Sequence, residues 1–209
     1  MYTPPAFRED DLQTIHALMR DNSFAILVTQ QDGVPLATHL PFMLDTERGP
    51  YGTLVAHMAR ANTQWHTFAE AHEALVIFQG PHAYVTPSWY DPGLNVPTWN
   101  YAAVHAYGVP SLIEDEAALY AMLSRLTATH EANFELPWLF EMGADDFRGK
   151  LKGIVGFEME ITRLEGKLKL SQNRSQADQE RVAAALAESP DTTVASVGQL
   201  MQARQQRRK

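Results

Sequence analysis

Apolar and polar side chains follow two different periods along this chain. Near the N-terminus the apolar side chains have helical spacing, which predicts an amphipathic helix over residues 12–19 with Asp10 or Asp11 as its cap. From residue 24 onward, short apolar runs separated by turn residues predict strands instead. Asp32 and Gly33 separate the first two runs, and this pair is typical of the turn of a β-hairpin.

The rest of the chain mixes short strands with helices. Further strands are expected at residues 52–58, 74–78, 82–87, 98–108 and 108–113, and a last β segment at residues 154–170. Helices are expected at residues 62–72 and 115–131, and after Ser175, which has the chemistry of an N-terminal cap. Many short strands with turn signals between them are typical of an antiparallel barrel or sandwich. We therefore expect a mainly β domain over residues 1–170 and a C-terminal helical extension, residues 171–209, packed on it.

Composition narrows the class of protein. The 209 residues are 45% hydrophobic and include no cysteine, which excludes disulfides, thiolate chemistry, iron–sulfur clusters and cysteine zinc sites. No apolar run is long enough to span a membrane, and the first ten residues lack the charged and apolar regions of a signal peptide. We expect a cytoplasmic protein with no membrane partner.

The charge is unevenly distributed. The net charge is −8, yet the last nine residues contain four cations and no acid, namely Arg204, Arg207, Arg208 and Lys209. This terminus is either a solvated helix end, which we favour, or a basic contact arm. The remaining body is more acidic than the net charge suggests and repels DNA phosphates, so DNA is a weakly supported partner.

The stretch from Leu54 to Phe68 places Arg60 and Asn62 between an expected strand and an expected helix. An arginine beside the N–H groups of a helix N-terminus is a common way to hold a phosphate. A solvated helix cap is the alternative interpretation, because asparagine is a good N-cap residue.

Two other segments are unusual. Residues 79–108 carry six aromatic tyrosine and tryptophan side chains among prolines and glycines, with Asp91 as the one charged side chain. Such a segment covers a partner subunit, a planar ligand or both, unless it is ordinary core beneath a long loop. Residues 167–174 end a strand with cations and amides, which suit phosphate, carbonyl or ring nitrogen, or simply cap a helix.

Known catalytic and metal-binding motifs are absent from the sequence. None of the eight histidines shows metal-ligand spacing such as H-E-x-x-H, so we expect no metal site. The sequence also contains no G-x-S-x-G elbow, Walker loop or G-x-G-x-x-G. Hydrolase and nucleoside-triphosphatase functions therefore lose most of their support, and no catalytic residue is identified.

Five segments together resemble a known family. In chain order they are "HLPF", "HMARANTQW", "FQGPHAYVTPSWY", "VPTWNY" and "KLSQNR". They look like the signature segments of the PaiB-type FMN-binding negative transcriptional regulators, members of the FMN-binding split-barrel superfamily that also contains the pyridoxamine phosphate oxidases. The resemblance covers nearly the whole chain and implies an antiparallel Greek-key split barrel with peripheral helices, dimeric, that binds FMN noncovalently.

The resemblance also implies where FMN binds. The strand-to-helix corner at His57 to Gln64 would contact the FMN phosphate, with Arg60 as the first choice and Asn62 and the helix N-terminus beside it. The remaining candidates are Thr38 and His39 beside the flavin ring; Trp99, Asn100 and Tyr101, which are candidates to approach from the partner chain of a homodimer; and Lys169, Gln172 and Arg174, whose contact with FMN is unassigned.

Three functions are compatible with this resemblance. The first is a flavin-binding regulator that lowers transcription directly or indirectly, as the family name implies. The second is a flavin-dependent oxidoreductase or flavin reductase, in which the ring carries the chemistry. The third is a haem-binding or haem-degrading split-barrel protein. No helix-turn-helix is legible in the sequence, which favours indirect repression within the first function.

Overall fold

The computed structural model describes residues 1–138 and 149–207. Its chain divides into two compact units. Unit 1 consists of Met1–Asn22, Phe78–His105 and Glu165–Lys209, and unit 2 consists of Ser23–Ile77 and Ala106–Leu164. The expected boundary at residue 170 stays a prediction.

Unit 2 contains most of the strands. Its elements are β2 (Phe24–Gln31), β3 (Val34–Pro41), β4 (Met43–Asp45), β5 (Thr53–Ala59), η2 (Thr63–Glu70), β8 (Pro110–Ile113), α2 (Glu116–Glu131) and β9 (Ile154–Glu160), together with the start of β6 (Ala74–Val85) and the end of β7 (Thr98–Gly108). One sheet has the strand order β4-β5-β9-β8, all antiparallel. The predicted hairpin is confirmed, because β2 pairs with β3 and the turn between them has positive φ at Asp32 and Gly33.

The core of unit 2 lies under the sheet of β5 and β9. Phe157 is fully buried, and its ring lies 5.1 Å from that of Phe68 and 6.0 Å from that of Phe42. Helix α2 begins at Glu116, within one residue of the predicted start, and Asp115 caps it by accepting from the Ala118 amide. Gly156 of β9 lets this helix approach, since a Cβ there would lie 2.4 Å from Leu119 Cδ1.

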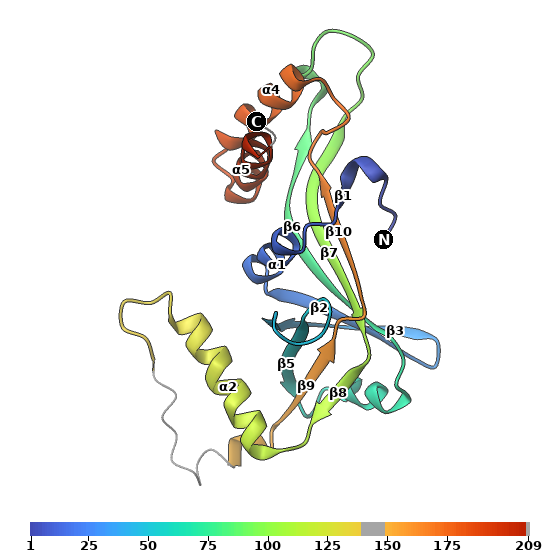
Figure 1. Cartoon of the computed structure of the whole chain (residues 1–209), viewed down its shortest axis with the longest axis vertical. Helices are drawn as coiled ribbons and strands as arrows, with labels where there is room; N and C mark the ends of the chain where they lie inside the picture. The colour runs from blue at the N-terminus through green and yellow to red at the C-terminus, as the bar shows by residue number, and fades with distance from the viewer. Residues whose placement is uncertain (139–148, 208–209) are drawn as a thin grey trace. The chain divides into compact units, whose positions relative to one another are not determined.

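Unit 1 combines the N-terminal and C-terminal segments of the chain with a segment from its middle. It contains η1 (Pro5–Phe7), β1 (Arg8–Glu9), α1 (Leu12–Asp21), η3 (Pro87–Trp89), α4 (Gln176–Ala187) and α5 (Thr192–Gln206), with most of β6, β7 and β10 (Arg163–Lys169). Helices α1, α4 and α5 lie on one side of these strands (Figure 1). The predicted helix start is confirmed, because Asp11 caps α1 by accepting from the Thr14 amide.

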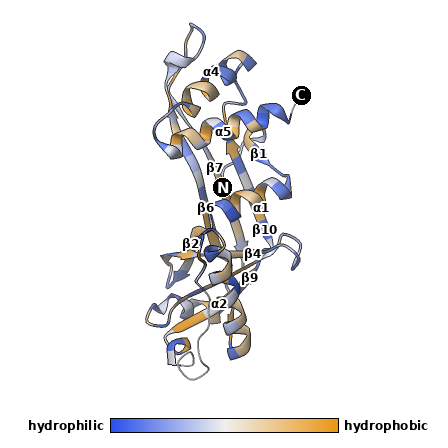
Figure 2. Ribbon diagram, turned by 90° about the vertical axis from the view of Figure 1, so that its left-hand side faces the viewer, coloured by the Kyte–Doolittle hydropathy of each residue, from blue (hydrophilic) through white to orange (hydrophobic). Residues whose placement is uncertain are grey.

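Helices α4 and α5 pack together closely in unit 1. Gly198 of α5 has no room for a side chain, because a Cβ there would lie 2.4 Å from the Ala187 amide nitrogen. Val182, Leu186 and Val197 are fully buried beside it. The C-terminal turns of α5 are hydrophilic (Figure 2). Among the described residues, no helix has the length and apolar character needed to cross a membrane.

Three sequence-based element predictions need correction. The two strands expected at residues 74–78 and 82–87 are one strand, β6. Gly80 does not make a turn between them; it lets β6 approach β7, since a Cβ added at Gly80 would lie 3.0 Å from the Ala102 carbonyl oxygen. Residues 154–170 are two strands, since β9 and β10 belong to different sheets and separate after Glu160. The expected helix at residues 62–72 is a 3-10 helix, η2. The predicted fold class, a mainly β antiparallel split barrel with peripheral helices, is confirmed.

Candidate functional site

Three of the candidate residues form a hydrogen-bonded cluster in unit 2, which we call the polar corner: Thr38, Asn62 and Gln64. Asn62 ends the turn after β5 and caps η2, where its Oδ1 accepts from the Gln64 amide at 3.1 Å. Its Nδ2 donates to Thr38 Oγ1 at 2.9 Å, and that hydroxyl in turn donates to Gln64 Oε1. The corner is therefore a preformed set of amides and a hydroxyl at the start of a helix.

Gln64 fixes the polar corner to the β2–β3 hairpin. Its side chain is 2% exposed, and Nε2 lies 3.1 Å from Thr29 Oγ1 and 3.3 Å from the carbonyl oxygens of Leu27 and Leu36. Thr38 and Asn62 are only half-buried. A buried amide with several partners holds its neighbours in place, so the accessible part of the corner has a defined geometry.

Arg60, the first choice for the phosphate, makes other contacts. Its Nε donates to the Lys152 carbonyl at 2.9 Å and its Nη2 to the Ile154 carbonyl at 2.8 Å. The guanidinium also lies 5.9 Å from the ring centre of Trp65. The structure therefore places Arg60 against the chain that enters β9, and its assignment to the phosphate stays a prediction.

The two histidines of this region differ in exposure. His39 is exposed on β3, and its ring lies 6.1 Å from that of Phe24. His57 of β5 is half-buried, and its Nδ1 is fully buried without a hydrogen-bond partner among the described residues. Burial lowers the pKa of His57, because the charged imidazolium loses more hydration than the neutral ring.

The candidates of unit 1 include a second, positively charged cluster. Lys167, Lys169 and Arg174 form what we call the cationic ridge. Burial lowers the pKa of Lys169, and the charges of Lys167 and Arg174 lower it further. The Lys169 ammonium donates to Thr98 Oγ1 and to the Trp99 carbonyl, so its hydrogen-bond partners are neutral groups. The ridge therefore carries positive charge, and within the described part of the chain no carboxylate pairs with Lys169.

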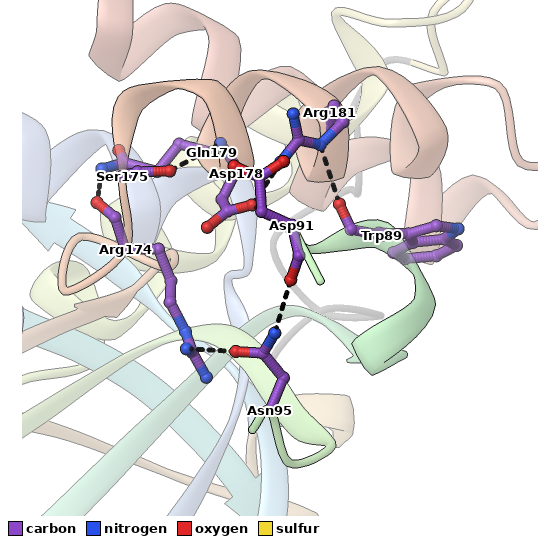
Figure 3. Close-up of polar contacts among 8 residues, drawn as sticks. All are labelled: Trp89, Asp91, Asn95, Arg174, Ser175, Asp178, Gln179 and Arg181. Atoms are coloured by element: carbon purple, nitrogen blue, oxygen red, sulfur yellow. Dashed lines mark hydrogen bonds and ion pairs between the residues drawn. The ribbon is translucent and has the colours of Figure 1, made fainter. Parts of the chain in front are cut away.

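Gln172 and Arg174 shape the segment after β10. The Gln172 amide closes a turn, since Oε1 accepts from the Leu170 amide at 2.7 Å and Nε2 donates to the Leu168 carbonyl. Arg174 Nη1 donates to Asn95 Oδ1 at 2.9 Å (Figure 3). The Arg174 guanidinium also lies 4.3 Å from the ring centre of Tyr90. Both side chains thus have internal structural contacts in unit 1.

One group of residues important for this region was missed by the sequence interpretation. Asp178 of α4 accepts from the Asp91 amide at 2.8 Å and pairs with Arg181, which also bonds the Trp89 carbonyl at 3.1 Å (Figure 3). The hydrogen bond from the Asp91 amide, followed by those from Ser175 and Arg181, lowers the pKa of Asp178. The spacing of Asp178 and Arg181, three residues apart on a helix, was the available signal.

Trp99, Asn100 and Tyr101 of β7 have different environments. Trp99 is 52% exposed and lies beside His82 and Tyr84, with ring centres 6.2 and 6.0 Å away. Asn100 is fully buried, and its Nδ2 donates to Ser171 Oγ at 2.9 Å. Tyr101 is half-buried, with the Lys167 ammonium 5.1 Å from its ring centre.

The candidates therefore fall into two groups. Thr38, Asn62 and Gln64 meet in unit 2, with Arg60, His39 and His57 elsewhere in that unit, and the other six belong to unit 1. Asn62 Nδ2 uses one of its two N–H groups for Thr38 Oγ1, and the second suits a phosphate oxygen, to which the half-buried Asn62 is accessible. The observed residues thus fit a phosphorylated flavin.

Comparison with known proteins identifies the family. The family described as "Putative FMN-binding domain" matches residues 1–163. The chain is 36% identical over 203 residues to "Protease synthase and sporulation protein PAI 2" of Bacillus subtilis strain 168, which covers 97% of each chain.

Solved structures share the fold. The flavocytochrome Anf3 from Azotobacter vinelandii superposes with a TM-score of 0.61 at 17% identity, covering 78% of this chain and 69% of that chain. The FAD and heme binding protein from Mycobacterium smegmatis superposes with a TM-score of 0.57 at 19% identity, covering 85% and 79%. The family match and the full-length relative show that this chain belongs to the PaiB-type FMN-binding split-barrel family, and its cofactor is FMN.

Proposed function

We propose that this protein holds the FMN phosphate at the polar corner and acts as a negative regulator of transcription without contacting DNA itself. The observation that carries the first part is the hydrogen-bonded arrangement of Thr38, Asn62 and Gln64 at the start of η2. Hydroxyl and amide groups at a helix N-terminus are favourable partners for phosphate oxygens.

The residues of the corner have distinct roles in this proposal. Asn62 directs the second N–H of its half-buried amide to the phosphate, Thr38 holds that amide in place, and buried Gln64 keeps η2 fixed to the hairpin. His39 on the exposed face of β3, one residue from Thr38, borders the flavin ring. FMN supplies one-electron and hydride chemistry when bound, and the protein supplies binding and orientation.

The regulatory part rests on the relative and on the C-terminus. The name of the Bacillus subtilis relative refers to protease synthesis and sporulation. The first two terminal cations have partners within unit 1, since Arg204 pairs with Glu9 at 2.9 Å and Arg207 donates to Thr14 Oγ1 at 2.9 Å. Arg208 and Lys209 lie outside the described residues. A helix end engaged in this way is a poor DNA-binding arm, which supports indirect repression.

A homodimer is part of the same proposal. Several large apolar side chains of unit 1 are exposed, including Tyr84 at 49%, Leu94 at 102%, Val96 at 62% and Trp99 at 52%. An exposed apolar surface of this kind supports association of two copies. Static light scattering should give a dimer at micromolar concentration, and Trp99→Ser should shift it toward monomer. A stable monomer of the unaltered protein contradicts this part.

The flavin part is tested by spectroscopy and titration. The purified protein should show flavin absorption bands that are released on denaturation, because binding is noncovalent. FMN titrated into flavin-stripped protein should bind more tightly than riboflavin, which lacks the phosphate, by about tenfold or more. A Soret band in place of flavin bands would favour the haem-binding alternative, and equal affinity for riboflavin would place the phosphate away from the corner.

The regulatory part is tested by DNA binding over a range of salt concentrations. We expect weak binding whose logarithm falls with log salt with a slope of at most about 4 for one tail or about 7 for two. Arg207→Gln, Arg208→Gln and Lys209→Gln together should remove most of it while keeping buried Met201 in place. Tight, sequence-specific binding by this triple variant at physiological salt would establish direct repression instead.

A further inference from the structure

Unit 2 contains a pocket of about 450 Å³ beside helix α2 that the proposed FMN site does not use. None of the polar-corner residues lines it. It is lined by charged residues (Arg60, Glu114, Glu116 and Lys152), by Trp65, and by the apolar residues Leu112, Ile113, Leu119, Leu151, Ile154 and Val155 with Gly156. A volume of this size is within the range of small-molecule sites, about 300 to 1,000 Å³.

One part of the lining is cationic. The hydrogen bonds of Arg60 to the Lys152 and Ile154 carbonyls fix its guanidinium beside the start of β9. Its Nη1 has no hydrogen-bond partner among the described residues, and the Lys152 side chain is exposed. A fixed guanidinium and an exposed ammonium in the same lining are a favourable arrangement for a carboxylate.

Another part of the lining is acidic. Glu114 and Glu116 flank Asp115, the residue that caps α2. Both glutamates are exposed, and the cap hydrogen bond of Asp115 to the Ala118 amide fixes the backbone that carries them. The Glu114 carboxylate on this fixed turn attracts an ammonium group.

The remaining lining is apolar and belongs to a packed cluster. Leu119 and Leu151 are buried together with Val55 and Met122, and Ile113 and Ile154 pack against them. Trp65 is half-buried, and its indole N–H donates to the Arg60 carbonyl at 3.1 Å, which holds the ring at the pocket. This part suits an aromatic or branched apolar group.

We propose that this pocket binds a small zwitterion with an apolar side group, of the class of large apolar α-amino acids. The carboxylate pairs with Arg60 and Lys152, the ammonium with Glu114, and the side group contacts Ile113, Leu119 and Trp65. The lining contains two cationic and two acidic side chains, so its net charge is close to zero. A ligand with both a positive and a negative group therefore matches the lining better than a simple anion or a simple cation. This binding is independent of the proposed FMN site.

The direct test is binding of L-phenylalanine to the full-length protein, with and without FMN, measured by ligand-observed NMR. The matched probes are 3-phenylpropionate, which lacks the ammonium, 2-phenylethylamine, which lacks the carboxylate, and glycine, which lacks the side group. L-phenylalanine should bind about tenfold more tightly than each of them, because each analogue leaves a charged or apolar part of the pocket without its partner. Equal binding of an analogue, or no binding of L-phenylalanine at millimolar concentration, overturns the proposal.

Variants locate the site. Lys152→Ala and Glu114→Gln should each weaken L-phenylalanine binding by about threefold to tenfold, whereas Lys150→Ala, an exposed lysine outside the lining, should leave it unchanged. FMN affinity should be the same in all three variants. If Lys152→Ala and Glu114→Gln weaken FMN but not L-phenylalanine, the pocket is part of the flavin site and the proposal is overturned. Failure of the polar corner to bind FMN would leave the L-phenylalanine result unaffected.

Discussion

The polar corner of unit 2 and the cationic ridge of unit 1 both contain residues that the family resemblance marks as candidate FMN ligands, yet they differ in charge and in how their polar groups are satisfied. The corner is neutral, and its amides and hydroxyl bond to one another with one buried anchor, Gln64. The ridge is charged, and the partners of the Lys169 ammonium among the described residues are neutral groups, while burial and then the two neighbouring cations lower the pKa of Lys169.

This difference separates two contributions to phosphate binding. Directional hydrogen bonds from a fixed cluster depend on geometry and persist in salt, whereas attraction to an exposed or half-buried cation is screened at physiological ionic strength. The corner should therefore determine most of the affinity for FMN. The ridge should add a smaller, salt-dependent amount.

The largest effect is expected at the corner. Asn62→Ala should weaken FMN binding by about tenfold or more, because a hydrogen bond to a charged group contributes about 1.5 to 3 kcal/mol. Fluorescence titration of flavin-stripped protein measures this change. Asn133→Ala, an exposed asparagine after α2, is the matched control and should bind FMN as the unaltered protein does. Normal FMN affinity in Asn62→Ala would remove the corner from the site.

The next effect concerns Arg60, which the sequence assigns to the phosphate and the structure places against two carbonyls. Arg60→Ala should lower the free energy of unfolding by about 1 to 2 kcal/mol, because it removes hydrogen bonds to the Lys152 and Ile154 carbonyls. Urea denaturation measures this loss. FMN affinity should fall less than in Asn62→Ala. The opposite ranking, with a larger loss of affinity in Arg60→Ala, would support the original assignment of Arg60 to the phosphate.

A smaller effect is expected at the ridge. Lys169→Met should weaken FMN binding by about twofold to fivefold at low salt, with the difference shrinking as salt increases. It should not lower the melting temperature, because it relieves repulsion from Lys167 and Arg174. Lys150→Met is the exposed control. A loss as large as that of Asn62→Ala, unchanged by salt, would make the ridge the main phosphate site.

The smallest expected effect is a pH dependence of the free energy of unfolding, to which one histidine of each unit contributes. Burial lowers the pKa of His57 in unit 2 and of His105 in unit 1 below the ordinary value. The unfolded chain therefore takes up protons first as the pH falls below about 6.5, and the free energy of unfolding should decrease until the pH passes the folded pKa, by about 1 kcal/mol or less for each histidine. His57→Gln and His105→Gln, compared in urea at pH 7.5 and 5.5, should each reduce this decrease. An unchanged decrease in both variants would assign it to other groups.

Local signals in the sequence predicted the elements whose causes are local. Asp11 and Ser175 cap the helices they were expected to cap, and the Asp32–Gly33 turn makes the expected hairpin. The resemblance of five short segments to a family also sufficed for the fold class and the cofactor, because these segments lie along nearly the whole chain.

Long-range contacts decided the rest. Gly80 does not form a turn; it allows β6 to pack closely against β7. Strands β9 and β10 separate because they pair with strands of different sheets. No local sequence pattern encodes either of these long-range contacts. Among the candidate ligands, Asn100 is buried against Ser171, and Arg60 is turned toward carbonyls of residues more than ninety positions away. A side chain's chemistry can be read from the sequence, but its direction depends on which distant donors and acceptors the fold brings within about 3 Å.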